Sequence, residues 1–234
     1  MGASSQSGGR FGADWPQILS LVGHQLRGPT SLISGYVEML ASEEVRTDPN
    51  RLNQVLGEIR ANVRELNRLT TELQTGSRAA QGPLPIRHQP VPVHSLIDDV
   101  VRSAAPMCKQ RNITLDSDTA RLGGSVIGDP FYLKICLLNL IDNAAKYGKP
   151  SGRVQLRTQP LGHLIELDVI DQGRGLGPRA PELFVPFAQG PEAQEGIGLG
   201  LTLVKAIVEA HGGAMVWRSG QESSVGFTVP WSQN

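Results

Sequence analysis

Apolar residues recur at close to the helical period in two stretches of the N-terminal third of the chain. Their positions are Ile18, Val22, Leu26, Ile33, Tyr36, Val37 and Leu40, then Leu52, Val55, Ile59, Leu66, Leu69 and Leu73. Both stripes predict amphipathic helices, and the second follows alternating steps of three and four, with Asn62 at one polar position. The polar segment 42–50 contains Asp48 and Pro49, which suit a turn, a cap and a helix start. The pattern predicts a helical hairpin whose second helix ends at Gly76.

One such hairpin would leave apolar surface exposed. Pairing of two copies into a four-helix bundle buries that surface, so the pattern favours a homodimer. An ordinary bundle without catalytic chemistry would show the same pattern.

Prolines and glycines separate the hairpin from a second region. They are Gly82, Pro83, Pro85, Pro90 and Pro92, a density that excludes a helix or a central strand. Beyond them, the patterns predict helices over 93–110, 130–147 and 199–211. Strands are predicted near 113–115, 125–127, 154–157, 164–170, 214–218 and 225–229. Adjoining strands between helices favour an α+β fold over strict βαβ alternation. The predicted organisation is a leader over 1–12, a hairpin over 13–77, a linker over 78–92 and a second domain over 93–234.

The composition argues against several classes of function. The chain has 234 residues, 39% of them hydrophobic, which is enough for a globular core. Lys plus Arg and Asp plus Glu both number 22, so no net charge points to nucleic acid or anionic lipid. No apolar run reaches the roughly 18 residues of a membrane span. Cys108 and Cys136 form no CxxC pair, and they are expected to be reduced core thiols, which favours a reducing, cytoplasmic compartment.

The helix over 130–147 carries the first candidate chemistry. Asn139 and Asn143 are four residues apart, and Lys146 follows one turn later, so all three are expected on one face. Amide oxygens suit hydrated Mg²⁺, and a lysine suits a triphosphate. Exposed polar residues without function would give the same spacing.

Two glycine-rich segments follow. Asp171 ends a predicted strand and opens the run Asp-Gln-Gly-Arg-Gly-Leu-Gly, where a carboxylate could accept a hydrogen bond from an exocyclic amine such as that of adenine. The run Gly196-Ile197-Gly198-Leu199-Gly200-Leu201 opens the helix over 199–211, and a helix N-terminus favours anions. This run is also similar to a dinucleotide fingerprint, but its place near the C-terminus, after a loop, argues against a βαβ unit.

In this order the motifs resemble the ATP-binding domain shared by histidine kinases, gyrase, the Hsp90 chaperones and MutL, and the stretch 200–213 resembles the histidine kinase branch. The resemblance covers roughly residues 93–230. It implies an α/β-sandwich ATP-binding domain of the Bergerat fold, with ATP and Mg²⁺ as ligands. Implied roles are Asn143 as Mg²⁺ ligand, Asn139 and Lys146 at the phosphates, and Tyr147 and Asp171 at the adenine. The remaining implied nucleotide-binding residues are Gly173, Gly175, Gly177, Gly196, Gly198, Leu199, Gly200 and Leu201.

The segment 176–195 would then be the lid over ATP. Its only basic residue is Arg179, and Gln189 is a candidate polar substitute.

The segment around His24 resembles the phosphoacceptor box of the dimerising domain of these kinases. His24 lies about 200° around the helix from Val22 and Leu26, so it is expected to point away from the apolar stripe. Pro29 removes an amide of the next turn and should loosen the helix. The family's usual acidic neighbour is replaced by Gln25, which cannot act as a base, so slower autophosphorylation is expected. Gly28 replaces the Thr or Asn of family phosphatases, so weak phosphatase activity is expected.

The resemblance implies a homodimeric kinase that phosphorylates His24 from Mg-ATP and passes the phosphoryl group to an aspartate of a response regulator. A degenerate kinase that regulates another signalling protein is the alternative, suggested by Gln25 and Gly28. An ATPase of the gyrase or chaperone type is a third reading, which the hairpin with His24 argues against. A membrane anchor, if any, would lie in a segment absent from this sequence.

Overall fold

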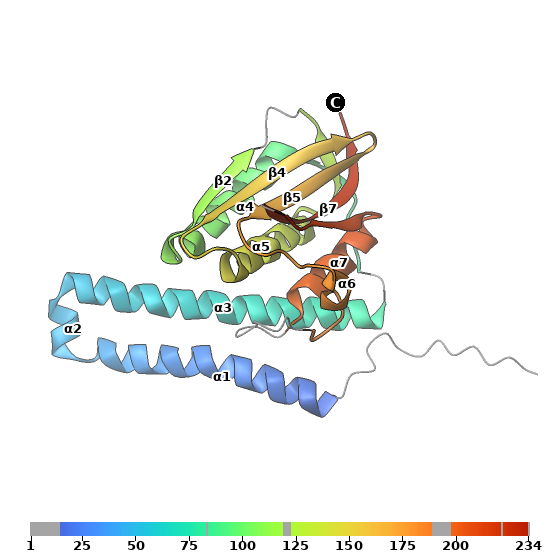
Figure 1. Cartoon of the computed structure of the whole chain (residues 1–234). Coiled ribbons are helices and arrows are strands. Elements are labelled where there is room, and N and C mark those ends of the chain that lie inside the picture. The colour runs from blue at the N-terminus through green and yellow to red at the C-terminus, as the bar shows by residue number, and fades with distance from the viewer. Residues whose placement is uncertain (1–14, 83, 119–122, 189–197, 221, 234) are drawn as a thin grey trace, which may run out of the picture.

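The N-terminal hairpin consists of two long helices joined by a short one. The computed structural model describes residues 15–82, 84–118, 123–188, 198–220 and 222–233. Helices α1 (Trp15–Leu40) and α3 (Pro49–Gln81) run antiparallel, and α2 (Glu43–Thr47) forms the corner (Figure 1). The Asp48 cap is confirmed, because its carboxylate accepts hydrogen bonds from the amides of Asn50 and Arg51 at 2.9 and 3.3 Å.

Two expectations about the hairpin were wrong. The segment 42–50 is not only a turn, because Ser42 caps α2 and Val45 is buried there. The second helix does not stop at Gly76 but continues to Gln81. A single glycine costs a helix only about 1 kcal/mol. The turn before Gly76 is held by tertiary packing, since Glu72 and Thr75 are buried. It ends where Gly82, with φ of +157°, precedes the prolines.

The C-terminal domain follows the predicted order of elements. Its helices are α4 (Val93–Gln110), α5 (Pro130–Tyr147), α6 (Ala180–Leu183) and α7 (Gly200–Ala210). Its strands are β1 (Gln89–Pro92), β2 (Thr114–Asp118), β3 (Ser125–Gly128), β4 (Arg153–Leu161), β5 (Leu164–Asp171), β6 (Ala214–Arg218) and β7 (Ser223–Ser232). Two elements, β1 and α6, were not predicted. The predicted linker over 78–92 therefore includes the end of α3 and an edge strand, a position that tolerates its prolines.

The seven strands form one mixed sheet in the order β1-β3-β7-β5-β4-β2, with β6 also paired to β7. Among the strands that the structure describes, only β2 and β4 pair in parallel, and the other pairs are antiparallel. Helices α4, α5 and α7 cover one face of the sheet and lie between it and the hairpin (Figure 1). The α+β prediction of a helical hairpin followed by an α/β sandwich is confirmed.

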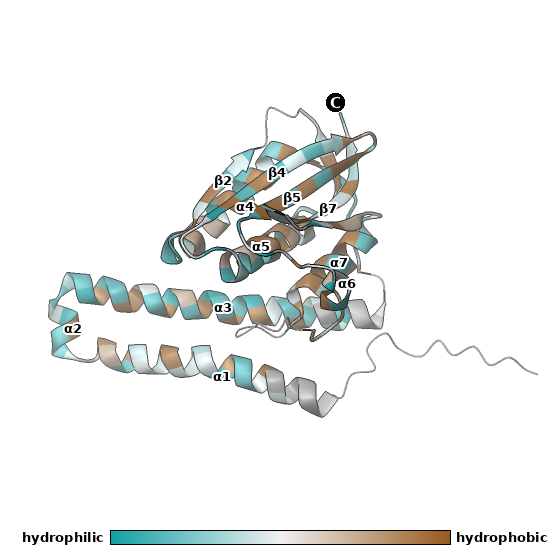
Figure 2. Ribbon diagram, viewed as in Figure 1, coloured by the Kyte–Doolittle hydropathy of each residue, from teal (hydrophilic) through white to brown (hydrophobic). Residues whose placement is uncertain are grey.

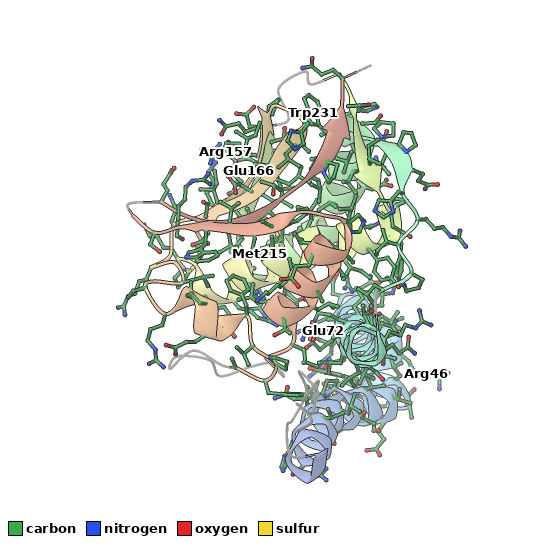
Figure 3. All side chains as sticks on the ribbon, turned by 90° about the vertical axis from the view of Figure 1, so that its right-hand side faces the viewer. Arg46, Glu72, Arg157, Glu166, Met215 and Trp231 are labelled. Atoms are coloured by element: carbon green, nitrogen blue, oxygen red, sulfur yellow. The ribbon has the colours of Figure 1, made fainter. Side chains whose placement is uncertain are left out.

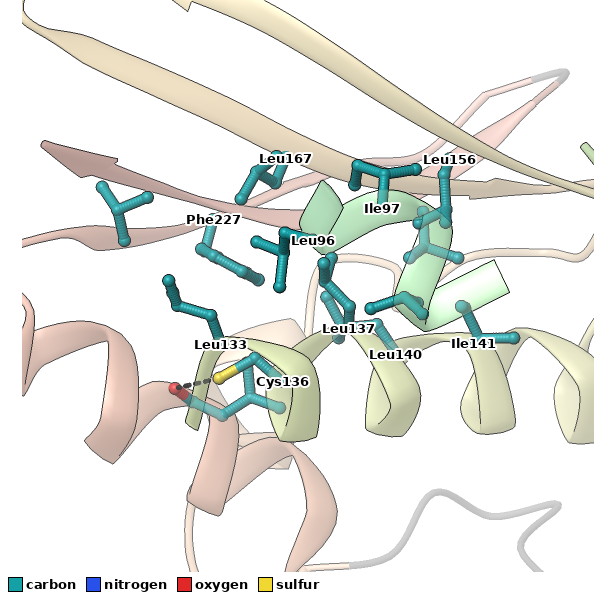
Figure 4. Packing of buried hydrophobic residues seen from close by; sticks show 14 of the residues in the cluster. Leu96, Ile97, Leu133, Cys136, Leu137, Leu140, Ile141, Leu156, Leu167 and Phe227 are labelled. Carbon is teal, nitrogen blue, oxygen red and sulfur yellow. Dashed lines mark hydrogen bonds between the residues drawn. The ribbon is translucent and has the colours of Figure 1, made fainter. Parts of the chain in front are cut away.

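The core lies between the sheet and these helices. Strand β5 directs alternate apolar residues, Ile165, Leu167 and Val169, into this layer, where they are almost fully buried. Figure 4 shows Leu133 and Leu137 of α5 packed beneath Leu167. In Figure 2, which colours the ribbon by hydropathy, α5 and β5 carry many hydrophobic residues. Both cysteines are free and buried, as expected.

The opposite face of the sheet carries a buried charge cluster. Arg157 of β4 and Arg218 of β6 bind the Asp168 carboxylate at 2.8 and 3.1 Å, and Arg218 also contacts Glu166 at 2.6 Å. Arg157 and Glu166 are labelled on this side in Figure 3. Burial, together with a hydrogen bond shared with Glu166, raises the pKa of Asp168 to about 6.

Candidate functional site

His24 lies on the exposed side of α1. Its side chain is exposed, whereas Val22 and Leu26 are half-buried and pack against Leu69 of α3. The predicted orientation away from the apolar stripe is therefore confirmed. Pro29 lies inside α1, one turn after His24, and α1 continues through it to Leu40.

A cleft of about 890 Å³ separates the hairpin from the C-terminal domain. His24, Gln25 and Gly28 line its hairpin side, and Asn139 and Lys146 of α5 line the domain side. The histidine and two residues predicted for the phosphate site therefore open into one space, although more than 100 residues separate them in sequence.

The α5 side of the cleft is held by local contacts. Asn139 is 8% exposed, and its Nδ2 donates to the Ile135 carbonyl at 3.0 Å. Lys146 Nζ lies 2.6 Å from Asp142 Oδ2. Sequence reasoning missed Asp142, although its spacing of four residues from Lys146 is typical of helical ion pairs.

Asn143 does not line this cleft, so the expectation of one shared face was only partly right. At 100° per residue, Lys146 lies about 20° from Asn139 around the helix axis, whereas Asn143 lies about 40° away in the opposite sense. The two amide side chains therefore point in directions that differ by about 40° around the helix axis. Asn143 is half-buried beside the cleft.

The C-terminal end of α5 meets the loop that begins at Asp171. The Gly173 amide and the Ser223 hydroxyl both donate to Asp171 Oδ1, at 2.6 and 2.8 Å. A Cβ on Gly173 would lie 2.7 Å from that oxygen and 2.9 Å from the Tyr147 carbonyl, so only glycine allows this approach. Tyr147 itself is 48% exposed. Ser223 was missed, because it lies 52 residues from its partner and belongs to no motif.

The remaining glycines shape the two loops. Gly175 and Gly177 both have positive φ angles, and the Gly177 amide donates to the Ser219 hydroxyl at 3.3 Å. Gly198, at φ of +73°, packs so closely that a Cβ would lie 2.6 Å from the Ala188 carbonyl. Arg179, in the expected lid, is exposed and pairs with Glu182 of α6 at 2.8 Å.

Helix α7 begins beside α5. Gly200 is its first residue, and a Cβ there would lie 3.0 Å from Asn139 Oδ1. Leu199 occupies the cap position, buried against Leu69 of the hairpin, and no side chain caps the helix. Leu201 is half-buried against the domain core. The predicted residues Gln189 and Gly196 lie outside the described part of the chain.

An ion cluster on α3, the α3 charge cluster (Glu65, Arg68 and Glu72), faces the domain side of the cleft. Arg68 contacts both carboxylates, with Nε 2.8 Å from Glu65 Oε2. Burial tends to raise the pKa of Glu65, but Arg68 outweighs it and lowers that pKa. Burial dominates at Glu72 and raises its pKa, despite the nearby charges of Arg68 and Lys146. The cluster was not predicted, although its spacings of three and four residues are visible in the sequence.

No helix in the described ranges is long and apolar enough to cross a membrane. Nor do the described residues include three or more His, Cys, Asp or Glu side chains grouped to hold a metal ion.

Comparison with known proteins identifies the domain. Residues 128–233 match the family model described as "Histidine kinase-, DNA gyrase B-, and HSP90-like ATPase". Signal transduction histidine-protein kinase/phosphatase MprB of Mycolicibacterium smegmatis is 34% identical over 207 residues, covering 85% of this chain and 41% of the relative. The Non-motile and phage-resistance protein of Caulobacter vibrioides is 27% identical over 226 residues, covering 92% and 27%. The chain spans about two fifths of the length of its MprB relatives.

Solved structures agree with this result. The mycobacterial sensor histidine kinase MprB aligns with a TM-score of 0.53 at 30% identity, covering 63% of this chain and 99% of that one. Full-length ShkA, solved in complex with AMPPNP, aligns with a TM-score of 0.65 at 20% identity over 95% of this chain and 47% of that one, which shows the shared fold. The fold and its glycine-rich loops thus define an ATP-binding domain of the histidine kinase, gyrase and HSP90 class. The chain belongs to the sensor histidine kinases.

Proposed function

We propose that this chain is a histidine kinase core that transfers the γ-phosphoryl group of ATP to His24 and then to an aspartate of a response regulator. One observation carries the proposal: exposed His24 lines the same cleft as Asn139 and Lys146 of the ATP-binding domain. A phosphoacceptor and the phosphate end of a nucleotide have to share such a space, because phosphoryl transfer depends mainly on positioning.

The proposed nucleotide site runs along α5. From Asn139 to Tyr147 the helix rises roughly 12 Å. The adenine would lie at the Tyr147 end, where Asp171 could accept a hydrogen bond from the exocyclic amine. The phosphates would lie at the Asn139 end, beside the uncapped N-terminus of α7, which favours anions. Gly173 and Gly200 let the two loops approach α5 closely, since a Cβ at either position would crowd Tyr147 or Asn139 of that helix.

The residues present also fit Mg²⁺. This ion commonly binds through nucleotide phosphates and few protein oxygens, so it needs no acidic cluster. The Asn143 side-chain oxygen and the phosphates would hold it. When bound, the ion would neutralise charge on the phosphates, and Lys146 would supply a further positive charge beside them.

In the proposed reaction, an imidazole nitrogen of His24 attacks the γ-phosphorus. The new nitrogen–phosphorus bond forms as the bond to the β–γ bridging oxygen breaks, and ADP leaves. The imidazole then loses the proton on its other ring nitrogen, the one that did not attack. Gln25 cannot accept that proton, so the proton passes to water, and we expect a rate lower by about 10²- to 10⁴-fold than with an adjacent base.

Labelling with γ-labelled Mg-ATP tests the proposal. We expect label that survives base and is lost in acid, present in the parent protein and absent in His24→Ala. His94→Ala removes another exposed histidine and serves as the matched control, which should keep the label. Label retained in His24→Ala would contradict the assignment of His24.

The degenerate kinase remains the second candidate, favoured by Gln25 at the position of the usual base. It predicts ATP binding without any label on His24. Gln25→Glu separates the two readings further, since a kinase limited only by proton transfer should gain label in this variant, whereas a regulatory module should not.

Partners and location follow from the same proposal. The half-buried apolar residues of the hairpin support a homodimer through a four-helix bundle. Histidine kinase ThkA has been solved in complex with response regulator TrrA, which supports a receiver domain as partner class. Because the reaction needs ATP and the cysteines are free, we infer a cytoplasmic location for this region. We expect weak phosphatase activity, since Gly28 lacks a side chain that could orient water.

A further inference from the structure

The α3 charge cluster places a buried carboxylate beside the proposed phosphate site. Leu69 of α3 is fully buried against Leu199, the residue before α7, and Glu72 follows on the same helix face. Figure 3 shows Glu72 where α3 meets the domain. The Glu72 side chain is 2% exposed. A Cβ on Gly200 would lie 4.0 Å from Glu72 Oε1, so the carboxylate approaches the first residue of α7.

The chemistry around Glu72 is that of an anion site. The N-terminus of α7 carries a partial positive charge and no side-chain cap, and α7 has 11 residues. Lys146 adds a full positive charge on the neighbouring helix. This charge acts to lower the pKa of Glu72, in opposition to the larger effect of burial, which raises it. A phosphate group would use the same helix end and the same lysine.

We propose that Glu72 acts as an internal anion that occupies the phosphate end of the nucleotide site while the hairpin is docked on α5 and α7. Docking and nucleotide binding therefore oppose each other. A triphosphate brought to this position would meet the Glu72 carboxylate, whose burial weakens the screening of like charges by water. Movement of α3 away from α7 would relieve that repulsion. This inference rests on the nucleotide site of the proposed function.

Ion pairs within each helix partly offset the burial of charge where α3 meets α5. Arg68 contacts Glu72 on the α3 side, and Asp142 pairs with Lys146 on the α5 side. The apolar contact of Leu69 with Leu199 adds to these pairs. Burial nevertheless raises the pKa of Glu72, which means that the buried charge destabilises the docked state. A bound nucleotide would therefore compete with the Glu72 carboxylate for the same positive charges.

Equilibrium binding of Mg-AMPPNP to the whole chain tests the proposal. All variants carry His24→Ala, so that phosphorylation plays no part. Glu72→Gln keeps the shape and removes the charge, and we expect it to bind the nucleotide about tenfold more tightly, within the usual range of coupling between sites. Glu65→Gln is the matched control: it contacts the same arginine, but its side chain is 37% exposed, and we expect a change below twofold.

Hydrogen exchange on the unsubstituted protein provides a second measurement that does not depend on the folding of a variant. Mg-AMPPNP should accelerate exchange of the amides of residues 69–73 and leave those of residues 52–56 unchanged. Unchanged or weaker nucleotide binding by folded Glu72→Gln would contradict the proposed competition between Glu72 and nucleotide. No change in amide exchange at residues 69–73 would contradict it as well. If neither the parent nor Glu72→Gln binds the nucleotide, the proposed nucleotide site itself is wrong.

Discussion

The paired serines at the start of β7 allow a sharp test of the adenine end of the site. Ser223 is fully buried and lies opposite Asp171 in the β5–β7 register, where its hydroxyl donates to Oδ1 at 2.8 Å. The next residue, Ser224, points to the other face of the sheet, and its buried hydroxyl has no partner among the described residues. Ser223→Ala and Ser224→Ala therefore remove the same atom from adjacent positions, and only the first affects Asp171.

The expected magnitude follows from this hydrogen bond. A hydrogen bond to a charged group contributes roughly 1.5–3 kcal/mol. The Gly173 amide still holds Asp171 in the variant, so we take the lower end of the range. About 1.4 kcal/mol corresponds to a tenfold change in affinity. Ser223→Ala should weaken ATP binding about tenfold, because Asp171 is no longer oriented toward the exocyclic amine, and Ser224→Ala should leave it unchanged.

Calorimetric titration measures the affinities of Mg-bound ATP and ITP for each variant. The comparison distinguishes a lost orientation of Asp171 from a general disruption of the nucleotide site. ITP carries a carbonyl in place of the exocyclic amine and so lacks the amine hydrogen that would be donated to Asp171; its affinity should therefore depend much less on Ser223. Equal losses of ATP and ITP binding in Ser223→Ala, or equal losses in the two serine variants, would refute the assignment of Asp171 to the adenine amine.

Three further predictions concern buried groups outside the cleft. Burial raises the pKa of the Cys136 thiol, so Cys136 should resist alkylation at neutral pH until the protein unfolds; rapid native labelling, measured by mass spectrometry, would contradict its burial. Burial lowers the pKa of His211, whose ring accepts from the Asp129 amide at 3.0 Å. Stability should therefore fall as the pH drops through about 6.5 and below. Urea titrations should show this loss in the parent and in His163→Ala, but not in His211→Asn. The pKa of Asp168 is raised to about 6, so the folded state binds an extra proton between about pH 4 and 6. The urea midpoint of the parent relative to Asp168→Asn should rise as the pH falls through this window, and a fall would show that Asp168 remains ionised.

Local patterns in the sequence were sufficient for most elements of the fold. Helices α4 and α5 and strand β6 have the predicted bounds, because apolar periodicity and nearby prolines or glycines mark their ends. The glycine-rich motifs also located both loops. The missed elements were short or depended on distant partners. Strand β1 exists because it pairs with β3, and its prolines argue against a strand when read alone.

The residues of the candidate site could be predicted from the sequence, but their arrangement could not. His24, Asn139, Lys146 and Asp171 could be selected from the sequence, because motif spacing and residue type carry their chemistry. The opening of His24, Asn139 and Lys146 into one cleft could not be predicted, because it depends on how the hairpin docks on the domain.

Local spacing in the sequence identifies the residues that carry chemistry and the helices and strands that hold them. The contact of Ser223 with Asp171 and the position of Glu72 near the first turn of α7 became visible only in the folded chain. Both contacts join segments far apart in the chain. Their physical basis is burial of polar groups between packed elements, which no local pattern records.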